Sequence, residues 1–383
     1  DNAPECTPTR CALLTGRYQQ RVGGLECAIG LGNVGRYDEA VWLQQRDELG
    51  LPASETSLAA MLRAGGYETA CFGKWHLGYL EKFSPNRHGF QEYFGILGGA
   101  ADYFSHTEPD GRPVLYHNQQ RVSRPGYTTD LIGKSAVEWL GRRRSGPFFL
   151  YVPFSAPHSP FQGPEDEGKT GTSAQRPDRA TYVRMVERMD QQVGAILEQL
   201  DRMKAAQNTL VIFLSDNGGP AGARNHPLRG GKSSLWEGGI RTPCLARWAG
   251  VLPEGTETAQ VTVTMDLTAT IMAAAGVRPP RGRKLDGVDL LPVWTGRRAP
   301  FPRTVFWRYK RLEARRKAVL DGELKYVVDN GREELHDLSE DPEEKRDLLA
   351  QRPEAAARMR EKLEAWEREV AAPRLREFRP ARG

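Results

Sequence analysis

A cysteine, a proline and an arginine stand close together near the start of the chain, in "CTPTR" at residues 6–10. Thr7 and Pro8 have the residue types of an N-cap and of a first helical residue, so the pattern predicts that a helix begins there. Cys6 would then lie where the free N–H groups and the positive end of the helix favour an anion. By this pattern alone, Cys6 is either a thiol nucleophile of low pKa or a buried structural cysteine.

Polar segments follow three predicted strands. The run "YETACF" ends at "GKWHLG", with Lys74 and His76; a second strand ends at "SAPHSP", with His158; and "LVIFL" ends at "SDNGG", with Asp216 and Asn217. In open α/β sheets ligands bind beyond the carboxyl ends of the strands, so we expect the three segments to meet at one crevice. Taken singly, His76 could be a core histidine and His158 a turn residue. Asp216 and Asn217 could form an ordinary Asx turn.

Short apolar runs alternate with helical patterns along most of the chain. This alternation predicts a largely parallel sheet covered by helices. The clearest unit is residues 180–219, where apolar residues at helical spacing precede a short apolar run that is closed by glycines. Beyond about residue 300, short antiparallel strands and a charged helix at residues 353–370 predict a smaller domain. We therefore divide the chain into residues 1–299 and 300–383.

Composition argues against several classes of protein. The longest apolar runs are far shorter than the roughly 18 residues of a membrane span, so none is predicted. The net charge of +5 is spread over 383 residues, and the densest basic stretches lack interleaved aromatic residues, so no nucleic-acid partner is expected. The five cysteines show no CxxC pair and no Cys/His zinc spacing, which argues against a metal knuckle or a dense disulfide framework.

Longer strings carry a family resemblance. "CTPTRCALLTGRY" closely resembles the signature of the type I sulfatases, "GGYETACFGKWHLG" resembles their other signature, and "SDNGG" is similar to their metal-binding strand end. The string "ELHDLSEDPEEKRDL" is similar to a common sulfatase ending. The resemblance implies an alkaline-phosphatase-like α/β fold, in which a mixed, mostly parallel sheet lies between helices and a smaller C-terminal α+β domain follows. It also implies a sulfuric ester hydrolase that acts on aryl or carbohydrate sulfate monoesters.

In that family the signature cysteine is oxidised after translation, so the resemblance implies that a formylglycine-generating enzyme converts Cys6 to formylglycine. One hydroxyl of the hydrated aldehyde would attack sulfur, and the second would expel sulfate; a serine could form the same adduct but would lack that exit. Arg10 would orient the diol, and Lys74 would contact both the diol and sulfate. His76 would take the proton of the second hydroxyl.

The resemblance assigns sulfate and metal ligands as well. His158, and Lys232 in "LRGGKSSLWEGGIR", would bind sulfate and assist the leaving oxygen. Asp216 and Asn217, together with the diol made from Cys6, would bind one calcium ion. The expected partner is a sulfated small molecule or a sulfated glycan.

The chain departs from the family pattern at its start. Sulfatases supply two further metal ligands, adjacent aspartates at the end of a first strand, whereas five residues precede Cys6 here. We therefore expect an N-terminally shortened form of a longer sulfatase, which as written binds calcium weakly and turns over little. Loss of an interior strand would also expose two sheet edges. The family favours a periplasmic or extracellular location, and the chain holds no N-terminal signal region to test this.

Three alternatives remain open on the sequence. Phosphonate or phosphate ester hydrolases of the wider alkaline phosphatase superfamily share the aldehyde, the metal and the fold, although the intact "GKWHLG" string favours sulfate. A non-catalytic remnant could bind sulfated glycans through Arg10, Lys74 and Lys232. A cysteine protease that pairs Cys6 with a histidine would leave "SDNGG" and Lys74 unexplained.

Overall fold

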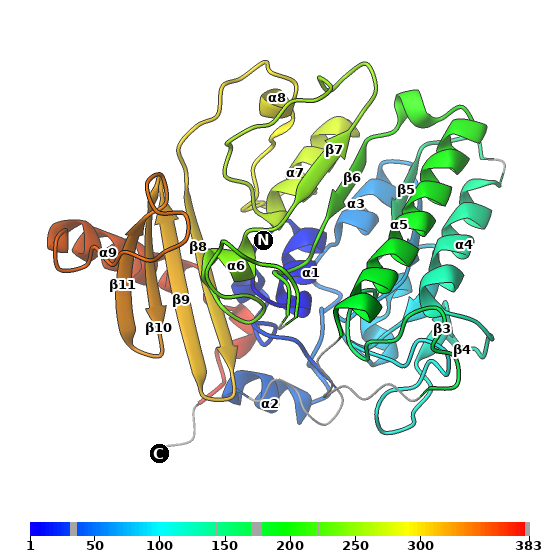
Figure 1. The fold of residues 1–383 in the computed structure, drawn as a ribbon, viewed down its shortest axis with the longest axis horizontal. Coiled ribbons are helices and arrows are strands. Elements are labelled where there is room, and N and C mark those ends of the chain that lie inside the picture. Colours follow the sequence, from blue (N-terminus) through cyan, green and yellow to red (C-terminus); the bar gives the residue numbers. More distant parts are fainter. Residues whose placement is uncertain (31–36, 143, 170–177, 221, 380–383) are drawn as a thin grey trace.

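The computed structural model describes residues 1–30, 37–142, 144–169, 178–220 and 222–379 (Figure 1). Residues 380–383, the end of the predicted smaller domain, lie outside these ranges. In the described residues a five-stranded sheet has the order β4-β3-β2-β1-β5, and β6 and β7 form a separate two-stranded sheet. These strands are β1 (Glu68–Phe72), β2 (Glu92–Ile96), β3 (Leu115–His117), β4 (Gln120–Arg121), β5 (Phe148–Tyr151), β6 (Val211–Leu214) and β7 (Cys244–Arg247).

The sheet is mixed, as the family resemblance implied. Its centre is parallel, because β1 pairs in parallel with both β2 and β5. The pairs β2–β3, β3–β4 and β6–β7 are antiparallel. The three strands predicted to end at polar segments are β1, β5 and β6, and the parallel centre places the ends of β1 and β5 at the same edge of the sheet.

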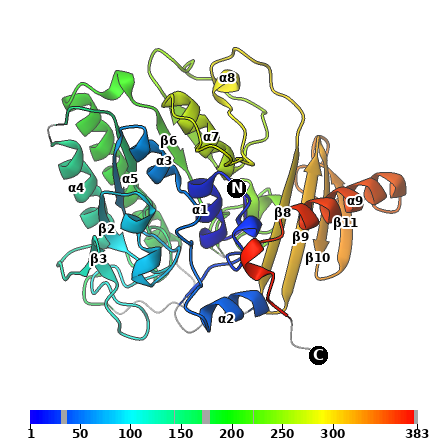
Figure 2. The same ribbon diagram turned by 180° about the vertical axis from the view of Figure 1, so that it is seen from behind.

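Helices cover both faces of the sheet. The α-helices are α1 (Cys6–Thr15), α2 (Asp38–Gln44), α3 (Leu58–Ala64), α4 (Thr128–Leu140), α5 (Arg179–Arg202), α6 (Glu237–Ile240), α7 (Thr264–Ala274), α8 (Leu291–Trp294) and α9 (Pro353–Glu369). Short 3₁₀ helices are η1 (Gln19–Arg21), η2 (Glu81–Phe83), η3 (Pro85–His88), η4 (Ala206–Asn208) and η5 (Pro373–Leu375). Figures 1 and 2 show α4 and α5 on one side of the sheet and α1, α3 and α7 on the other.

The alternation of side chains along β1 explains these layers. Ala70 and Phe72 belong to a cluster with Ile132 and Trp139 of α4, whereas Cys71 belongs to the cluster that includes α1. Successive side chains of a strand point to opposite faces, so one short apolar strand serves two cores. This is why the strand reads as a continuous apolar run in the sequence.

The C-terminal region forms an antiparallel sheet of order β11-β10-β9-β8 with α9 packed against β9 and β10 (Figure 2). Its strands are β8 (Thr304–Arg311), β9 (Ala314–Asp321), β10 (Leu324–Asp329) and β11 (Arg332–Asp337). Along β8, Val305, Trp307 and Tyr309 are buried and alternate with less buried residues. They share one apolar cluster with Leu14 of α1 and Trp366 of α9. The C-terminal sheet is thus packed directly on the part of the chain that carries "CTPTR".

One large cavity, of about 1980 Å³, lies between β5 and β6 and reaches Cys6. Residues 148–151 of β5 and 211–214 of β6 both line it, and these two strands do not pair with each other among the described residues. On β6 and β7, the paired residues Phe213 and Leu245 are exposed. The expectation that an interior strand is missing from this chain stays a prediction.

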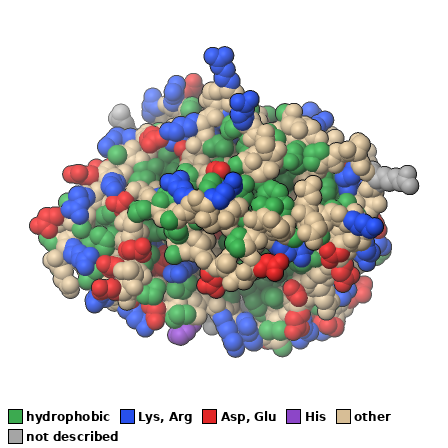
Figure 3. Space-filling model, turned by 90° about the horizontal axis from the view of Figure 1, so that it is seen from above, with side chains coloured by type: hydrophobic (Ala, Val, Ile, Leu, Met, Phe, Trp, Pro, Cys, Tyr) green, Lys and Arg blue, Asp and Glu red, His purple; other side chains and the backbone are tan. Residues whose placement is uncertain are grey.

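No helix of the described residues is long and apolar enough to cross a membrane. The face seen in Figure 3 carries side chains of both charge signs interspersed with hydrophobic ones, without a field of one sign. No disulfide occurs in the described part of the chain, where four of the five cysteines are buried and Cys244 is exposed.

Candidate active site

The ends of β1 and β5 approach each other closely, and glycine makes this possible. At Gly73, directly after β1, φ is 138°, and a Cβ there would lie 2.1 Å from the carbonyl oxygen of Pro153. Only glycine tolerates both the backbone angle and the contact. The next amide, of Lys74, donates to the same carbonyl at 2.7 Å. The Lys74 side chain is therefore positioned by backbone contacts to the neighbouring strand end.

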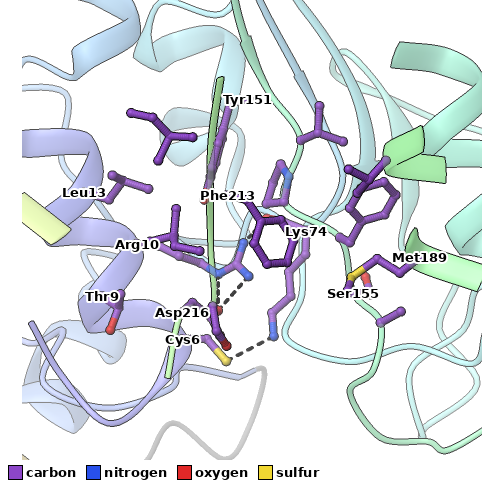
Figure 4. Close-up of a pocket in the computed structure, with 18 of the residues that line it drawn as sticks. Cys6, Thr9, Arg10, Leu13, Lys74, Tyr151, Ser155, Met189, Phe213 and Asp216 are labelled. Atoms are coloured by element: carbon purple, nitrogen blue, oxygen red, sulfur yellow. Dashed lines mark hydrogen bonds and ion pairs between the residues drawn. The ribbon is translucent and has the colours of Figure 1, made fainter. Parts of the chain in front are cut away.

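Four side chains lie around the thiol of Cys6 in the first turn of α1, and Figure 4 shows one of them, Lys74, with its ammonium group directed at the sulfur. Lys74 Nζ lies 3.3 Å from Cys6 Sγ and Lys232 Nζ lies 3.7 Å from it. The thiol faces Asn217 Oδ1 at 3.5 Å. Lys232 Nζ also donates to His158 Nε2 at 3.1 Å. The predicted crevice is therefore one site, assembled from α1, the ends of three strands and the loop that carries Lys232.

Arg10 and Asp216 form an ion pair next to the residues that surround Cys6. Arg10 Nε and Nη2 donate to Asp216 Oδ2 at 2.9 and 2.7 Å, and Nη1 donates to the carbonyl of Lys74 at 2.7 Å. Burial disfavours the charged form of Arg10, but the Asp216 carboxylate more than offsets this and raises the pKa of the guanidinium. Arg10 thus ties α1 to the ends of β1 and β6. Its contacts orient residues around Cys6 rather than Cys6 itself.

The site carries an excess of positive charge. Burial opposes ionisation of the Cys6 thiol, but Lys232 and Lys74 outweigh it and hold its pKa well below the ordinary value. Burial lowers the pKa of Lys74, whereas the pKa of Lys232 is raised because Cys6, Asp216 and Glu5 outweigh its burial. Two ammonium groups beside a helix N-terminus form a site for an anionic group.

The two histidines of the site are held neutral in different tautomers. His76 Nε2 donates to the carbonyl of Ile29 at 2.6 Å, which leaves the buried Nδ1 as a lone pair without a hydrogen-bond partner among the described residues. Burial, and then Lys74, lowers the His76 pKa. His158 Nδ1 donates to the carbonyl of Ser159, so its Nε2 accepts from Lys232. Burial and the two lysines lower the His158 pKa to about 4.

The backbone is shaped around His76. Its φ is 57°, in the left-handed region that a non-glycine residue adopts at a cost. Gly99 lies against the ring, and a Cβ at that position would come within 2.5 Å of Cε1 and Nε2. Thr7 Oγ1 donates to the His76 carbonyl at 2.9 Å and accepts from the amide of Ile29 at 3.2 Å. The backbone angle, Gly99 and Thr7 thus fix the orientation of the His76 ring, whose Nδ1 has no hydrogen-bond partner among the described residues.

The predicted N-cap at Thr7 is wrong. The helix begins at Cys6, its N-cap is Glu5, and Pro8 falls in its first turn, where a missing N–H costs nothing. The Thr7 hydroxyl is instead used by the loop that holds His76. A local sequence pattern cannot show that the Thr7 hydroxyl bonds to His76 and Ile29 instead of capping the helix, because both partners are distant in the sequence.

The described residues supply few metal ligands. Asp216 Oδ2 is taken by Arg10, which leaves Asp216 Oδ1 and Asn217 Oδ1 as side-chain oxygens near Cys6. No group of three or more His, Cys, Asp or Glu side chains that could hold a metal occurs in the described ranges. Calcium takes six to eight oxygen ligands, so these residues fit only part of a calcium site.

The sequence did not identify Glu5, which lies directly before Cys6 and is fully buried. Its carboxylate accepts from Ser233, the neighbour of Lys232, at 2.5 Å. Tyr103 supports the site as well, because its hydroxyl donates to the His158 carbonyl at 3.0 Å. An acidic residue directly before the signature cysteine is the sequence signal that could have found Glu5.

Fold and site together define a class: an alkaline-phosphatase-like α/β protein with a cationic pocket at the carboxyl ends of its strands. The sulfatase family model matches residues 2–277, and the model described as the N-sulphoglucosamine sulphohydrolase C-terminal region matches residues 231–369. The chain belongs to the sulfatase family.

Two curated relatives show how much of the family the chain covers. It is 34% identical to N-acetylgalactosamine-6-sulfatase of Homo sapiens in an alignment that covers 76% of this chain and 56% of that protein. It is 32% identical to steryl-sulfatase of Rattus norvegicus in an alignment that covers 77% of this chain and 63% of that protein. The chain therefore spans less than two thirds of the length of each.

A solved structure, Ps i-CgsB in complex with k-i-k-neocarrahexaose, is similar over most of its length. The TM-score is 0.82 at 29% identity, with 96% of this chain and 83% of that chain covered. The similarity extends through the C-terminal sheet, so the predicted fold class is confirmed for both parts of the chain.

Proposed function

We propose that this protein is a formylglycine-dependent sulfuric ester hydrolase. The observation that carries the proposal is the convergence of Lys74, Lys232 and Asn217 on Cys6 Sγ, within 3.3 to 3.7 Å. In the proposal a formylglycine-generating enzyme oxidises Cys6, so Sγ stands in for an oxygen of the hydrated aldehyde. Two lysines around that oxygen would bind the sulfate group that it attacks.

In the first half of the reaction, one hydroxyl of residue 6 attacks sulfur and the bond from sulfur to the ester oxygen breaks. The alcohol leaves, and its oxygen takes a proton from the Lys232 ammonium group, which is charged at ordinary pH. The proton that the attacking hydroxyl loses replaces it on Lys232, whose Nζ lies 3.7 Å from Cys6 Sγ, so Lys232 ends this half of the reaction protonated. His158 is neutral at ordinary pH because its pKa is about 4, so its Nε2 holds the ammonium in place by accepting from it. The sulfate is now esterified to residue 6.

In the second half, His76 Nδ1 takes the proton of the other hydroxyl. The lone pair left on that oxygen forms the carbonyl, the carbon–oxygen bond to sulfate breaks, and sulfate leaves. Water then rehydrates the aldehyde. A base at this step must be neutral before it acts, and the lowered pKa of His76 satisfies that requirement.

A calcium ion, when bound, would add positive charge beside the ester oxygens. Asp216 and Asn217 are the described residues that would hold it, and no step is assigned to it because they supply only part of a site. Arg10 would keep Asp216 oriented through its two hydrogen bonds.

The relatives favour a carbohydrate sulfate as substrate. One is named for N-acetylgalactosamine 6-sulfate, and the structural relative was solved with a neocarrahexaose. Steryl-sulfatase shows that a different alcohol is compatible with the family. We infer a sulfate monoester of a sugar hydroxyl, presented to the pocket by a sulfated glycan or oligosaccharide.

Comparing esters that differ only in the transferred group tests the proposal. We expect the protein to release sulfate from 4-nitrophenyl sulfate and from a 6-sulfated sugar, and to cleave an aryl phosphonate more slowly. Faster phosphonate cleavage would assign the chain to the neighbouring hydrolase activity. Binding of sulfated glycans without any turnover would make it a non-catalytic binder.

A further inference from the structure

Glu5 is a buried carboxylate at the junction of the catalytic cysteine, the Lys232 loop and the C-terminal sheet. It is fully buried, and it precedes Cys6 by one residue. Although it is the N-cap residue of α1, its side chain makes no capping hydrogen bond. The carboxylate instead points away from the helix, so its contacts need another explanation.

Three donors converge on one oxygen of this carboxylate. Glu5 Oε1 accepts from Ser233 Oγ at 2.5 Å, from Tyr309 OH at 2.9 Å and from Arg311 Nη1 at 2.6 Å. The other oxygen accepts from the amide of Ala28 at 2.7 Å. Both oxygens therefore accept from protein donors, and the carboxylate connects parts of the chain that are distant in the sequence.

The partners of Glu5 also hold the loop beside Lys232. Ser233 has a φ of 70°, an unfavourable angle for serine, and its amide donates to the Pro4 carbonyl at 2.9 Å. Arg316 Nη1 donates to the Ser233 carbonyl at 2.6 Å. Ser233 is thus bound through its amide, hydroxyl and carbonyl, and a strained residue persists only when its surroundings hold it this way.

We propose that Glu5 is a positioning residue for the sulfatase reaction, which sets the distance between residue 6 and Lys232 and makes the C-terminal sheet part of the active-site support. Glu5 neighbours the nucleophile, Ser233 neighbours Lys232, and Tyr309 and Arg311 belong to β8. The inference rests on the proposed function for its kinetic part. Its structural part, that Glu5 orders residues 229–236, stands independently.

Glu26 provides a matched control. It is likewise a buried carboxylate that receives an arginine of β8, since Arg308 Nε and Nη2 donate to it at 2.7 and 2.8 Å. It has no contact with the Lys232 loop among the hydrogen bonds of the described residues. Replacing it removes a comparable buried ion pair without touching the residues that flank the reactive groups.

The experiment compares Glu5→Gln and Glu5→Ala with Glu26→Gln and Glu26→Ala, with kcat normalised to the fraction of protein that carries formylglycine. Glu5→Ala should lower kcat by about 10²-fold with little change in KM, since a small misplacement of reacting groups costs about that much. Glu5→Gln keeps one acceptor oxygen, which can still receive Ser233 Oγ, but it places an amide NH₂ where Glu5 accepts from Ala28, so it should recover part of the rate. The Glu26 variants should lose thermal stability and retain kcat.

Hydrogen–deuterium exchange supplies a readout that does not need turnover. The Glu5 variants should exchange faster in a peptide covering residues 229–236, where Lys232 and Ser233 amides are hydrogen-bonded, and the Glu26 variants should not. Faster exchange in an enzyme without sulfatase activity would support the positioning role and reject the proposed function. Unchanged exchange, or equal kcat losses in the Glu5 and Glu26 variants, would overturn the inference; if Glu5→Ala does not fold, Glu5→Gln decides.

Discussion

Replacing Cys6 with serine should leave the fold intact and lower kcat for a sulfate ester by about 10⁴-fold or more, the scale seen when a nucleophile is removed. Serine has nearly the same shape, and Cys6 Sγ makes only long contacts to Lys74, Lys232 and Asn217. A serine hydroxyl could still attack sulfur, but the resulting ester has no second hydroxyl to expel sulfate. The enzyme should therefore stop after one half of the reaction.

Intact-protein mass spectrometry after incubation with 4-nitrophenyl sulfate measures this arrest. The Cys6→Ser variant should accumulate one covalent sulfate per chain, and a Cys6→Ala variant, which has no nucleophile, should accumulate none. Replacing Cys11, another buried cysteine of α1, with serine is the matched control and should leave turnover unchanged. Comparable turnover in Cys6→Ser and the unaltered protein would contradict a mechanism that needs an aldehyde at this position.

Replacing Lys74 with methionine should lower kcat by about 10²- to 10³-fold, as expected for one charged group that stabilises a transition state. Stability should be unchanged or higher. Lys74 is buried beside two other cations, Arg10 and Lys232, and burial lowers its pKa, which shows that the charged form is costly in the folded protein. Methionine has a similar length and removes that cost.

Lys325 is the matched control for Lys74, because it is also a fully buried lysine but does not line the cavity that reaches Cys6. Its Nζ is 2.7 Å from Glu237 and 2.8 Å from Glu344. Lys325→Met would remove the close cation from two buried carboxylates, leaving Glu237 only Arg241 at 3.9 Å, and should destabilise the protein by about 3–5 kcal/mol. The folded fraction should keep its kcat. If Lys74→Met shows this same pattern, with lost stability and retained kcat, Lys74 is structural and has no part in catalysis.

Much of the site could be predicted from the sequence, because its residues follow strands that the apolar pattern identifies. Lys74, His158 and Asn217 lie in the loops that follow β1, β5 and β6, and each lies at the cavity with Cys6. Lys232 follows no strand directly, and its position was found only through the resemblance of the surrounding string. The sheet was expected to be mostly parallel, and the parallel pairs are those that align the strand ends around the site.

The contacts that could not be predicted are those made by residues far apart in the chain. Glu5 is bound by Tyr309 and Arg311, which are 304 and 306 residues away. The Thr7 hydroxyl serves the His76 loop, 69 residues away, so its apparent role as an N-cap was wrong. The packing of the C-terminal sheet on α1 brings Tyr309 and Arg311 to Glu5. A local sequence pattern cannot predict that packing.

Peptide mass spectrometry across Cys6 tests the central claim most directly. The protein would be purified from cells that co-express a formylglycine-generating enzyme, with a known sulfatase as a positive control. The account predicts that the peptide containing residue 6 carries CHO in place of CH₂SH. An unmodified thiol at Cys6, in protein from cells where the control sulfatase is fully converted, would contradict it.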